Sequence, residues 1–319
     1  MTVGRNWHRQ LRPTASSRLG GIAAADLGVL LLASLAVSTS GPMIAALSAP
    51  FLAIAFWRNA IVATVIAGAI IGRPSVRAEY ASLTQRQIGV IVLAGLLLAA
   101  HFACWTPSVN YTTVASATAL VRAQPVWTAL GARAFGRSVS RGTWVGIGVS
   151  LAAVVLLTGS DLAVSGRALG GDLLALVAGA LAAAYTGAGE VARRTVSTGV
   201  YTSICYGTCA LVLLGAALLG RVQLTGFDTE VWLRLLALTV MAQLLGHTLF
   251  NRVVGRVGAT VVATAILFEV PGAALIAAVF LHQTPPATAV PAGILLLVGV
   301  FVVVRAEGTR LAAHALPVD

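Results

Sequence analysis

Long apolar stretches alternate with short polar clusters along almost the whole of this chain. A helix needs about 20 apolar residues to cross a hydrocarbon core of about 30 Å, because each residue advances it by about 1.5 Å. Stretches of about this length lie near 24–46, 50–72, 88–107, 112–132, 143–159, 170–189, 200–220, 231–251, 258–281 and 286–304. We therefore predict an all-α membrane protein with about ten transmembrane helices.

The composition supports the same class of protein. Of the 319 residues, 58% are hydrophobic and 10% are charged, whereas a soluble domain carries about 25% charged residues. The net charge of +11 arises from 21 Arg and no Lys, and a strongly basic balance is also typical of nucleic-acid-binding proteins. Here the arginines lie between apolar stretches and form no patch on a polar domain. We therefore expect a lipid bilayer, and no nucleic acid, around the chain.

The arginines are distributed unevenly between alternate loops. If the N-terminus is cytoplasmic, the inner segments hold sixteen Arg, whereas the outer loops hold Arg167 and Arg221, with Arg234 just inside a helix. The outer side also collects the acidic residues Asp161, Asp172, Asp228 and Glu230. Cytoplasmic loops carry an excess of basic residues. We therefore expect a multi-pass protein of the cell inner membrane with both termini cytoplasmic.

The second half of the chain repeats the first after 146 positions. Asp26, His101 and Pro125 recur as Asp172, His247 and Pro271, with their spacings unchanged. The predicted segments are an Arg-rich tail (1–22), a first five-helix repeat (23–160), a second five-helix repeat (161–305) and a C-terminal tail (306–319). Because five is an odd number, the second repeat enters the membrane from the opposite side. Two such inverted repeats are a recurring architecture of transporters.

Two groups of residues carry a resemblance to a known family. One is Gly41-Pro42, followed by Pro50-Phe51 and by Ala55-Phe56-Trp57-Arg58-Asn59; the other is Asn251-Arg252-Val253-Val254-Gly255-Arg256-Val257-Gly258-Ala259-Thr260, followed by Glu269-Val270-Pro271. They resemble the first two helices, and the junction of the eighth and ninth helices, of EamA-type proteins in the drug/metabolite transporter superfamily. The resemblance covers about 24–305.

This resemblance implies a ten-helix exporter or exchanger of small metabolites, with a central cavity lined chiefly by helices 1, 3, 4, 6, 8 and 9. The chain departs from the family at one pair of positions. Many members carry Gly-Glu after the fourth and ninth helices, where this sequence has Gly136-Arg137 and His282-Gln283. We therefore expect the ends of these helices to be tied differently.

Three charged residues lie well inside predicted spans, namely Arg58, Arg122 and Glu269. A charge at this depth costs at least about 2.5–3.5 kcal/mol and faces the bundle interior or a cavity. Glu269 could bind an amine on a substrate, carry a coupled proton, or form a structural ion pair with Arg122. Arg122 could clamp a carboxylate or phosphate or tie helices together. Arg58 resembles an Arg common on the family's second helix, and either a structural role or substrate contact is open to it.

Weaker polar and aromatic groups complete the set of candidates. They are His101, His247, Asn251, Trp105, Gln124, Ser40 and Tyr185. Each could contact substrate, or could be a hydrogen-bonding or packing residue between helices. Trp57 and Trp127 could likewise form walls of a cavity or only pack. Pro42, Pro125 and Pro271 are candidate kinks or hinges, because proline removes a backbone hydrogen bond from a helix.

The sequence holds no motif for catalysis or nucleotide binding. It contains no phosphate-binding G-x-x-x-x-G-K-[ST] loop, no H-E-x-x-H zinc pair and no G-x-S-x-G nucleophile turn. Its three cysteines suit neither a disulfide framework nor a zinc site. We expect a secondary transporter, with no enzyme activity, cofactor or metal, that moves an amino acid or organic anion by alternating access around a midplane cavity. A non-transporting binding, assembly or lipid-flipping protein is the alternative, and the oligomeric state stays open.

Overall fold

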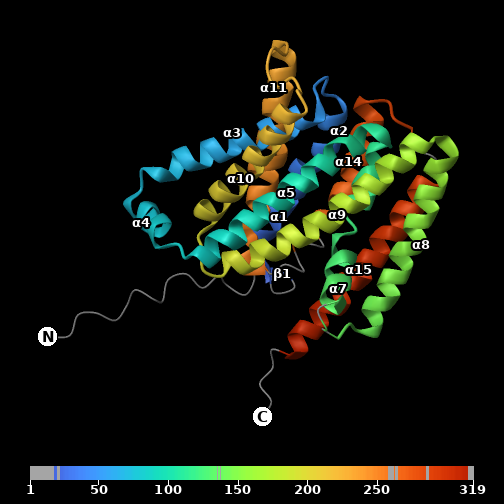
Figure 1. Cartoon of the computed structure of the whole chain (residues 1–319). Helices are drawn as coiled ribbons and strands as arrows, with labels where there is room; N and C mark the ends of the chain where they lie inside the picture. Colours follow the sequence, from blue (N-terminus) through green and yellow to red (C-terminus); the bar gives the residue numbers. More distant parts are fainter. Residues whose placement is uncertain are drawn as a thin grey trace.

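The computed structural model describes residues 18–19, 22–134, 136, 138–257, 262, 265–284 and 287–314. Within these ranges the only strands are the two-residue pair β1 (Arg18–Leu19) and β2 (Ile22–Ala23), and the other regular elements are helical (Figure 1). The helices of the first half are α1 (Ala24–Ser38), α2 (Ser40–Ala45), α3 (Phe51–Ile71), α4 (Pro74–Ser82), α5 (Gln85–Tyr111), α6 (Val114–Val121), α7 (Gln124–Ala134) and α8 (Arg141–Val164).

The helices of the second half follow in a related order. They are α9 (Gly166–Arg193), α10 (Thr198–Leu219), α11 (Thr229–Leu238), the π-helix η2 (Thr239–His247), α12 (Thr248–Val257), the 3₁₀ turn η3 (Ile266–Phe268), α14 (Glu269–Phe280) and α15 (Ala289–His314). In Figure 1 the start of α1 and the end of α15 both lie at the lower edge, and the loop between α10 and α11 lies at the top.

Six helical segments of the described chain are long and apolar enough to cross a membrane. They are Ala24–Ala45, Phe51–Ile71, Gln85–Tyr111, Gly166–Arg193, Thr198–Leu219 and Thr229–Phe250, and two shorter apolar helices span Ile266–Phe280 and Val290–Ala306. The predicted class of helical, multi-pass membrane protein is confirmed. The total of ten spans stays a prediction, because the predicted span 112–132 is broken into α6 and α7, and 258–281 is only partly described. The exposed helix α4 was not predicted.

The distribution of side chains is the reverse of that in a soluble protein. Leu211, Leu219 and Val155 are 70%, 89% and 70% exposed, whereas Arg58 and Glu269 are completely buried. Large exposed apolar side chains are stable in hydrocarbon, where polar groups must instead find partners inside the protein. Asp172, which the charge count assigned to the outer side, is also buried, near the start of α9. The fold therefore has a lipid-facing exterior and a partly polar interior.

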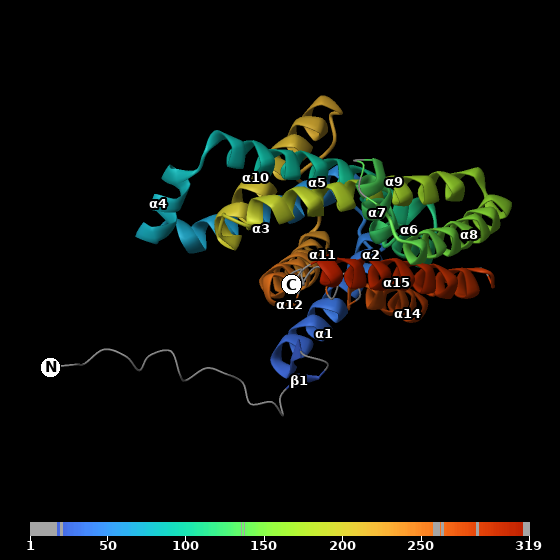
Figure 2. The same cartoon turned by 90° about the horizontal axis from the view of Figure 1, so that it is seen from below.

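The two halves share one plan. Three helices of the first half coincide with helices of the second half after a shift of 146 residues, with bounds that agree within four residues. The pairs are α3 (51–71) with α10 (198–219), α5 (85–111) with α11 through α12 (229–257), and α8 (141–164) with α15 (289–314). The packing repeats as well. Three helices of the first half pack on their own counterparts in the second half: α3 on α10, α6 on α14, and α8 on α15. The contact between α5 and α9 also has a counterpart, which is the contact of η2 and α12 with α1. Figure 2 shows α8 and α15 side by side. Contacts of this kind indicate an approximate twofold relation between the halves.

Short polar residues define where several long helices begin. The hydroxyl of Thr84 accepts a hydrogen bond from the backbone N–H of Gln87, and the Gln87 side chain accepts one from the Thr84 backbone N–H, which makes a capping box. Thr113, Ser165 and Ser197 cap α6, α9 and α10 in the same i to i+3 pattern. These side chains satisfy N–H groups that the first helical turn leaves without partners.

Each candidate proline follows a break in its span. Pro42 lies in α2, just after the interruption at Thr39. Pro125 follows the break between α6 and α7, and Pro271 lies near the start of α14, after η3. Because proline has no N–H and its ring clashes with the preceding turn, an unbroken helix is disfavoured at these places. The predicted interruptions are therefore present; a hinge role stays a prediction.

Candidate functional site

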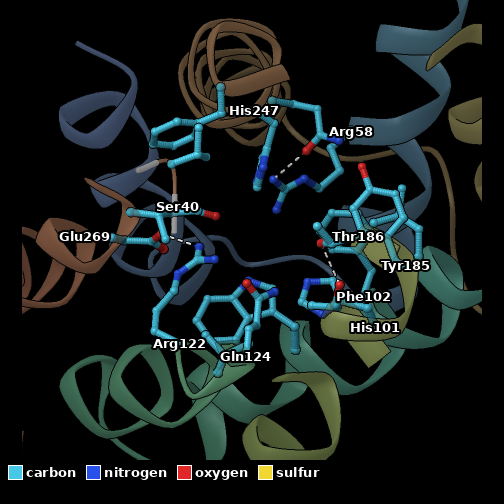
Figure 3. A pocket seen from close by; sticks show the side chains of 18 of the residues that line it. Ser40, Arg58, His101, Phe102, Arg122, Gln124, Tyr185, Thr186, His247 and Glu269 are labelled. Atoms are coloured by element: carbon cyan, nitrogen blue, oxygen red, sulfur yellow. Dashed lines mark hydrogen bonds and ion pairs between the residues drawn. The ribbon is translucent and has the colours of Figure 1, made fainter. Parts of the chain in front are cut away.

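A cavity of about 170 Å³ lies among the helices of both halves. Its lining comes from α2, α3, α5, the junction of α6 and α7, α9, α10, η2, α12, η3 and α14. The six helices expected to line a central cavity all contribute. The second and seventh helices contribute as well, through Arg58 on α3 and Tyr206 on α10. The side chains that converge on this space are shown in Figure 3.

Nine of the ten residues proposed from sequence line this cavity. They are Glu269, Arg122, Arg58, His101, His247, Trp105, Gln124, Ser40 and Tyr185. The tenth, Asn251, belongs to α12, and its side chain lies outside the described part of the structure. The structure therefore brings together groups that are up to 229 positions apart in the chain, as Ser40 and Glu269 are. Their roles toward a substrate remain predictions.

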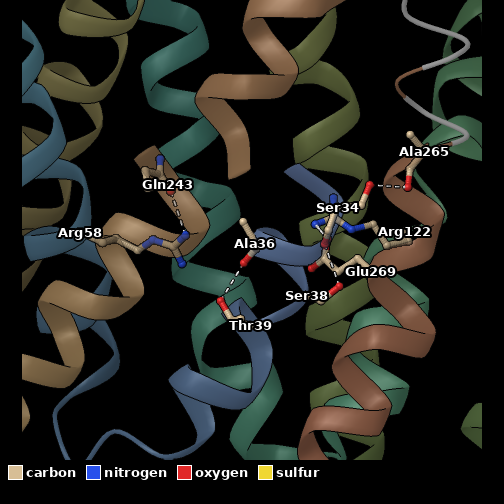
Figure 4. A network of polar contacts seen from close by, with 9 residues as sticks. All are labelled: Ser34, Ala36, Ser38, Thr39, Arg58, Arg122, Gln243, Ala265 and Glu269. Atoms are coloured by element: carbon tan, nitrogen blue, oxygen red, sulfur yellow. Dashed lines mark hydrogen bonds and ion pairs between the residues drawn. The ribbon is translucent and has the colours of Figure 1, made fainter. Parts of the chain in front are cut away.

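Arg122 and Glu269 form an ion pair at the breaks of the two related helices. Arg122 is the C-terminal cap of α6, and Glu269 is the first residue of α14. Nη2 of Arg122 donates a hydrogen bond to Oε2 of Glu269 (Figures 3 and 4), and the side chains are 10% and 1% exposed. Nε of Arg122 and Oε1 of Glu269 have no hydrogen-bond partner among the described residues. The ion pair with Arg122, one of the alternatives for Glu269, is therefore present, and it also borders the cavity.

Part of the Arg58 guanidinium has partners, and two of its nitrogens have none in the described structure. Its Nη2 donates to Oε1 of Gln243 at 2.8 Å, and the Gln243 amide lies 3.5 Å from Oδ1 of Asn59. The guanidinium stacks over the ring of Phe102, with Cζ 4.5 Å from the ring centroid. Although the side chain is completely buried, Nε and Nη1 have no partner in the described structure. Arg58 is therefore oriented by Gln243 and Phe102 and keeps unsatisfied donors.

Both histidines of the repeat line the cavity. Nδ1 of His101 lies 2.9 Å from the carbonyl oxygen of Ala178 on α9. A carbonyl can only accept, so Nδ1 carries the hydrogen and Nε2 of a neutral ring is left as an acceptor. His247 lies in the π-helix η2, which also contains the lining residue Gln243. π-Helical segments often occur at functional sites.

The end of α1 is tied to the region of the ion pair by serine hydroxyls. Oγ of Ser34 donates to the carbonyl oxygen of Ala265 at 2.9 Å, and Oγ of Ser38 donates to that of Ser34 at 2.8 Å (Figure 4). The Thr39 hydroxyl donates to the Ala36 carbonyl at 2.7 Å. These bonds satisfy backbone carbonyls near the interruption of the first span, as hydrocarbon surroundings require.

The tryptophans divide between two roles. Trp105 lines the cavity. Trp57 does not, because its indole N–H donates to the carbonyl of Leu224 at 2.6 Å and its ring packs on Trp232. Trp57 therefore ties α3 to the loop before α11, and Trp127 also lies outside the lining. Of the two alternatives left open for the tryptophans, lining the cavity therefore fits Trp105, whereas packing fits Trp57.

Sequence reasoning missed some lining residues, including Gln243, Tyr206 and Phe102. Gln243 carried a usable signal, because a carboxamide inside an apolar span needs partners just as the histidines do. Phe102 carried none, because an aromatic residue in a span is as well suited to lipid or to the core. Its place under Arg58 follows only from the tertiary fold.

The departure from the family's Gly-Glu pair has a structural counterpart. His282 adopts a φ of 52°, in the left-handed region that glycine favours, and the Gln283 side chain accepts a hydrogen bond from the backbone N–H of Val114 at 3.2 Å. Gln283 thereby ties the end of α14 to the start of α6 through a neutral acceptor. At the other position Gly136 has a φ of 77°, and Arg137 lies outside the described residues.

A lipid-facing bundle of two related halves around a buried, charged cavity defines a polytopic membrane protein with an internal site. The EamA-like transporter family model matches 25–159 and 169–305, one match in each half. The chain therefore belongs to the EamA-like transporter family, whose members are membrane transporters of the drug/metabolite transporter superfamily.

Comparison with solved structures supports the fold. One crystal structure shares 19% sequence identity with this chain, covers 92% of it and 99% of its own length, and has a TM-score of 0.59. At this level of identity the likeness shows the fold alone. No curated protein matches the sequence.

Proposed function

We propose that this protein is a secondary transporter that moves a small metabolite, an amino acid or organic anion, by alternating access around the cavity. The observation that carries the proposal is the convergence of Arg58, Arg122 and Glu269, from both halves of the chain, on one buried space. A bundle that served only as a scaffold in lipid would gain little from burying these charges, because each one is costly at this depth.

The Arg122–Glu269 ion pair has two possible arrangements, formed and broken. Arg122 and Glu269 lie on related helices at the breaks that precede Pro125 and Pro271. A proton that competes with Arg122 for Glu269 would weaken the tie between α6 and α14, which pack on each other. Ligand binding shifts a conformational equilibrium only by its differential affinity for the two states. Breaking and remaking this pair is a physical source of such a difference.

The proposed topology is that of ten spans in two inverted five-helix repeats, in the cell inner membrane, with both chain ends cytoplasmic. It is supported by the sixteen inner arginines and by the twofold pattern of helix contacts. Export or exchange is the direction that we infer from the resemblance to the family.

The test is solute flux in proteoliposomes that contain the purified full chain. We expect counterflow of at least one labelled solute from a panel of amino acids and organic acids, and its loss in Glu269→Gln. Glu190→Gln is the matched control, because Glu190 makes an exposed i,i+4 pair with Arg194 (3.3 Å) at the end of α9.

Three results would contradict the proposal. A folded protein that moves no solute of the panel would favour a binding, assembly or lipid-flipping role. Normal flux with normal pH dependence in Glu269→Gln would remove Glu269 from the mechanism. Tags showing the two chain ends on opposite sides of the membrane would exclude the topology.

A further inference from the structure

The charges that line the cavity do not cancel. Its charged lining residues among those described are Arg58, Arg122 and Glu269, so two guanidiniums face one carboxylate. Glu269 is already paired with Arg122. The cavity therefore keeps one positive charge, on Arg58. A buried charge without a counter-charge is strongly unfavourable, whereas a paired and hydrogen-bonded one is tolerated.

Arg58 is built to receive that counter-charge. Gln243 and Phe102 fix its guanidinium, and the unsatisfied Nε and Nη1 belong to a side chain with no solvent exposure (Figure 3). Arg58 and Arg122 reach into the cavity from opposite walls in this view. A carboxylate is a strong acceptor for guanidinium donors. A monoanion at Arg58 would bring the net charge of the lining and ligand to zero.

The other ligand classes leave the charge uncompensated. A zwitterion such as an amino acid adds no net charge, so one positive charge would remain buried, and a neutral ligand has the same result. A cation would raise the excess to two. Oε1 of Glu269, which lacks a partner in the described structure, is an acceptor that a neutral donor such as a ligand hydroxyl can fill without altering this balance.

The size and walls of the cavity limit the rest of the ligand. A cavity of about 150 Å³ holds a benzene molecule, so a cavity of about 170 Å³ suits a ligand of about six to nine non-hydrogen atoms. Phe102, Trp105 and Phe250 supply apolar surface for its body. Typical sites for drug-sized molecules are larger, about 300–1,000 Å³.

We propose that the cavity selects small organic monoanions, with the ligand's carboxylate on Arg58 and the Arg122–Glu269 pair intact as a neutral wall. This inference rests on the proposed transport function and chooses between its two substrate classes, in favour of the organic anion over the amino acid. Arg58 is accordingly the specificity-determining residue.

The test measures binding to the full chain in nanodiscs by titration calorimetry. The probes are lactate, alanine and lactamide, which share a shape and differ in charge as monoanion, zwitterion and neutral amide. Benzoate, benzamide and benzylamine repeat the comparison with a larger body. We expect lactate or benzoate to bind at least tenfold more tightly than every partner in its own set.

Variants separate Arg58 from general effects. Arg58→Gln should weaken binding of the preferred anion at least tenfold, and Arg58→Lys should retain the preference for the anion with lower affinity. Arg194→Gln, at an exposed arginine (70% exposed), should bind as the parent does. The comparison of probes in the parent protein stands even if a variant fails to fold.

The outcomes distinguish this inference from the transport function itself. Tighter binding of alanine, an amide or benzylamine, or no anion preference in either set, overturns the monoanion class, as does unchanged anion binding in Arg58→Gln. If one of these results is found and proteoliposomes still show flux of other solutes, the monoanion class is wrong and the proposed transport function stands. Selective anion binding without flux of any solute would instead support the class and contradict transport.

Discussion

The Arg122–Glu269 pair permits a quantitative test of what holds the two halves together. Glu269→Gln keeps the shape of the side chain and removes its charge, which leaves a guanidinium that is 10% exposed without its counter-charge. Breaking a buried ion pair costs about 3–5 kcal/mol. Because the Arg122 side chain keeps 10% of its surface exposed, we expect the lower end, about 3 kcal/mol, for Glu269→Gln and for Arg122→Gln.

The double variant separates the interaction free energy of the pair from the separate effects of losing each side chain's charge. Replacing both partners by neutral groups of similar volume is often nearly neutral or stabilising, so Arg122→Gln/Glu269→Gln should be more stable than either single variant. The coupling free energy from the double-mutant cycle should then exceed about 2 kcal/mol. The assay is unfolding by sodium dodecyl sulfate in mixed micelles, monitored through the circular-dichroism signal of the helices.

The same cycle on the exposed Glu190–Arg194 pair is the control, and its coupling should stay below about 1 kcal/mol. The reasoning would be refuted if the destabilisations of the two single buried variants summed to that of the double variant within about 0.5 kcal/mol. It would also be refuted if Glu269→Gln unfolded at the same detergent fraction as the parent. Either result would mean that the charges are solvated through the cavity and tie nothing together.

Two further changes test one contact at the site and one contact between α8 and α15, each measured by the same unfolding assay. Gln243→Leu removes the acceptor from Nη2 of Arg58 and should cost about 1–3 kcal/mol; an effect no larger than that of the exposed Gln223→Leu would contradict the assigned contact. Gly299→Val places a new Cβ 2.5 Å from Oγ of Ser150 and 2.8 Å from the carbonyl oxygen of Gly146. It should therefore force α8 and α15 apart, at about 1–3 kcal/mol. Gly293→Val, with nothing within 4 Å of its Cβ, is the matched control, and equal losses in the two variants would exclude a tight contact at Gly299.

The repeat was the most informative sequence signal for the site. The recurrence of His101 as His247, and of Pro125 as Pro271, identified positions that the structure places at the cavity or at the related breaks of two helices. The signal works where the two halves meet, because related positions there lie close together, as those of α6 and α14 do. It failed for Gln243, which has no polar relative 146 positions earlier, where the chain has Leu97.

The prolines predicted interruptions in the two spans around the ion pair, but the sequence did not predict how the segments on either side of each break would be oriented. The apolar stretch 112–132 reads as one helix, yet it ends at Val121 and resumes at Gln124, which turns Arg122 toward Glu269. Pro125 predicted an interruption, but the direction of the two halves after it depends on α9 and α14, which pack against α6.

The amino-acid sequence by itself determined that this is a helical membrane protein built from two related halves. Hydropathy, arginine placement and a fixed repeat are local or periodic properties, and the bilayer admits few structures that satisfy them. Only the tertiary structure decided which buried charges meet. Arg122 pairs with Glu269 while Arg58 binds Gln243 and keeps two unsatisfied nitrogens, because the partners come from helices distant in the chain and their distances depend on how those helices pack.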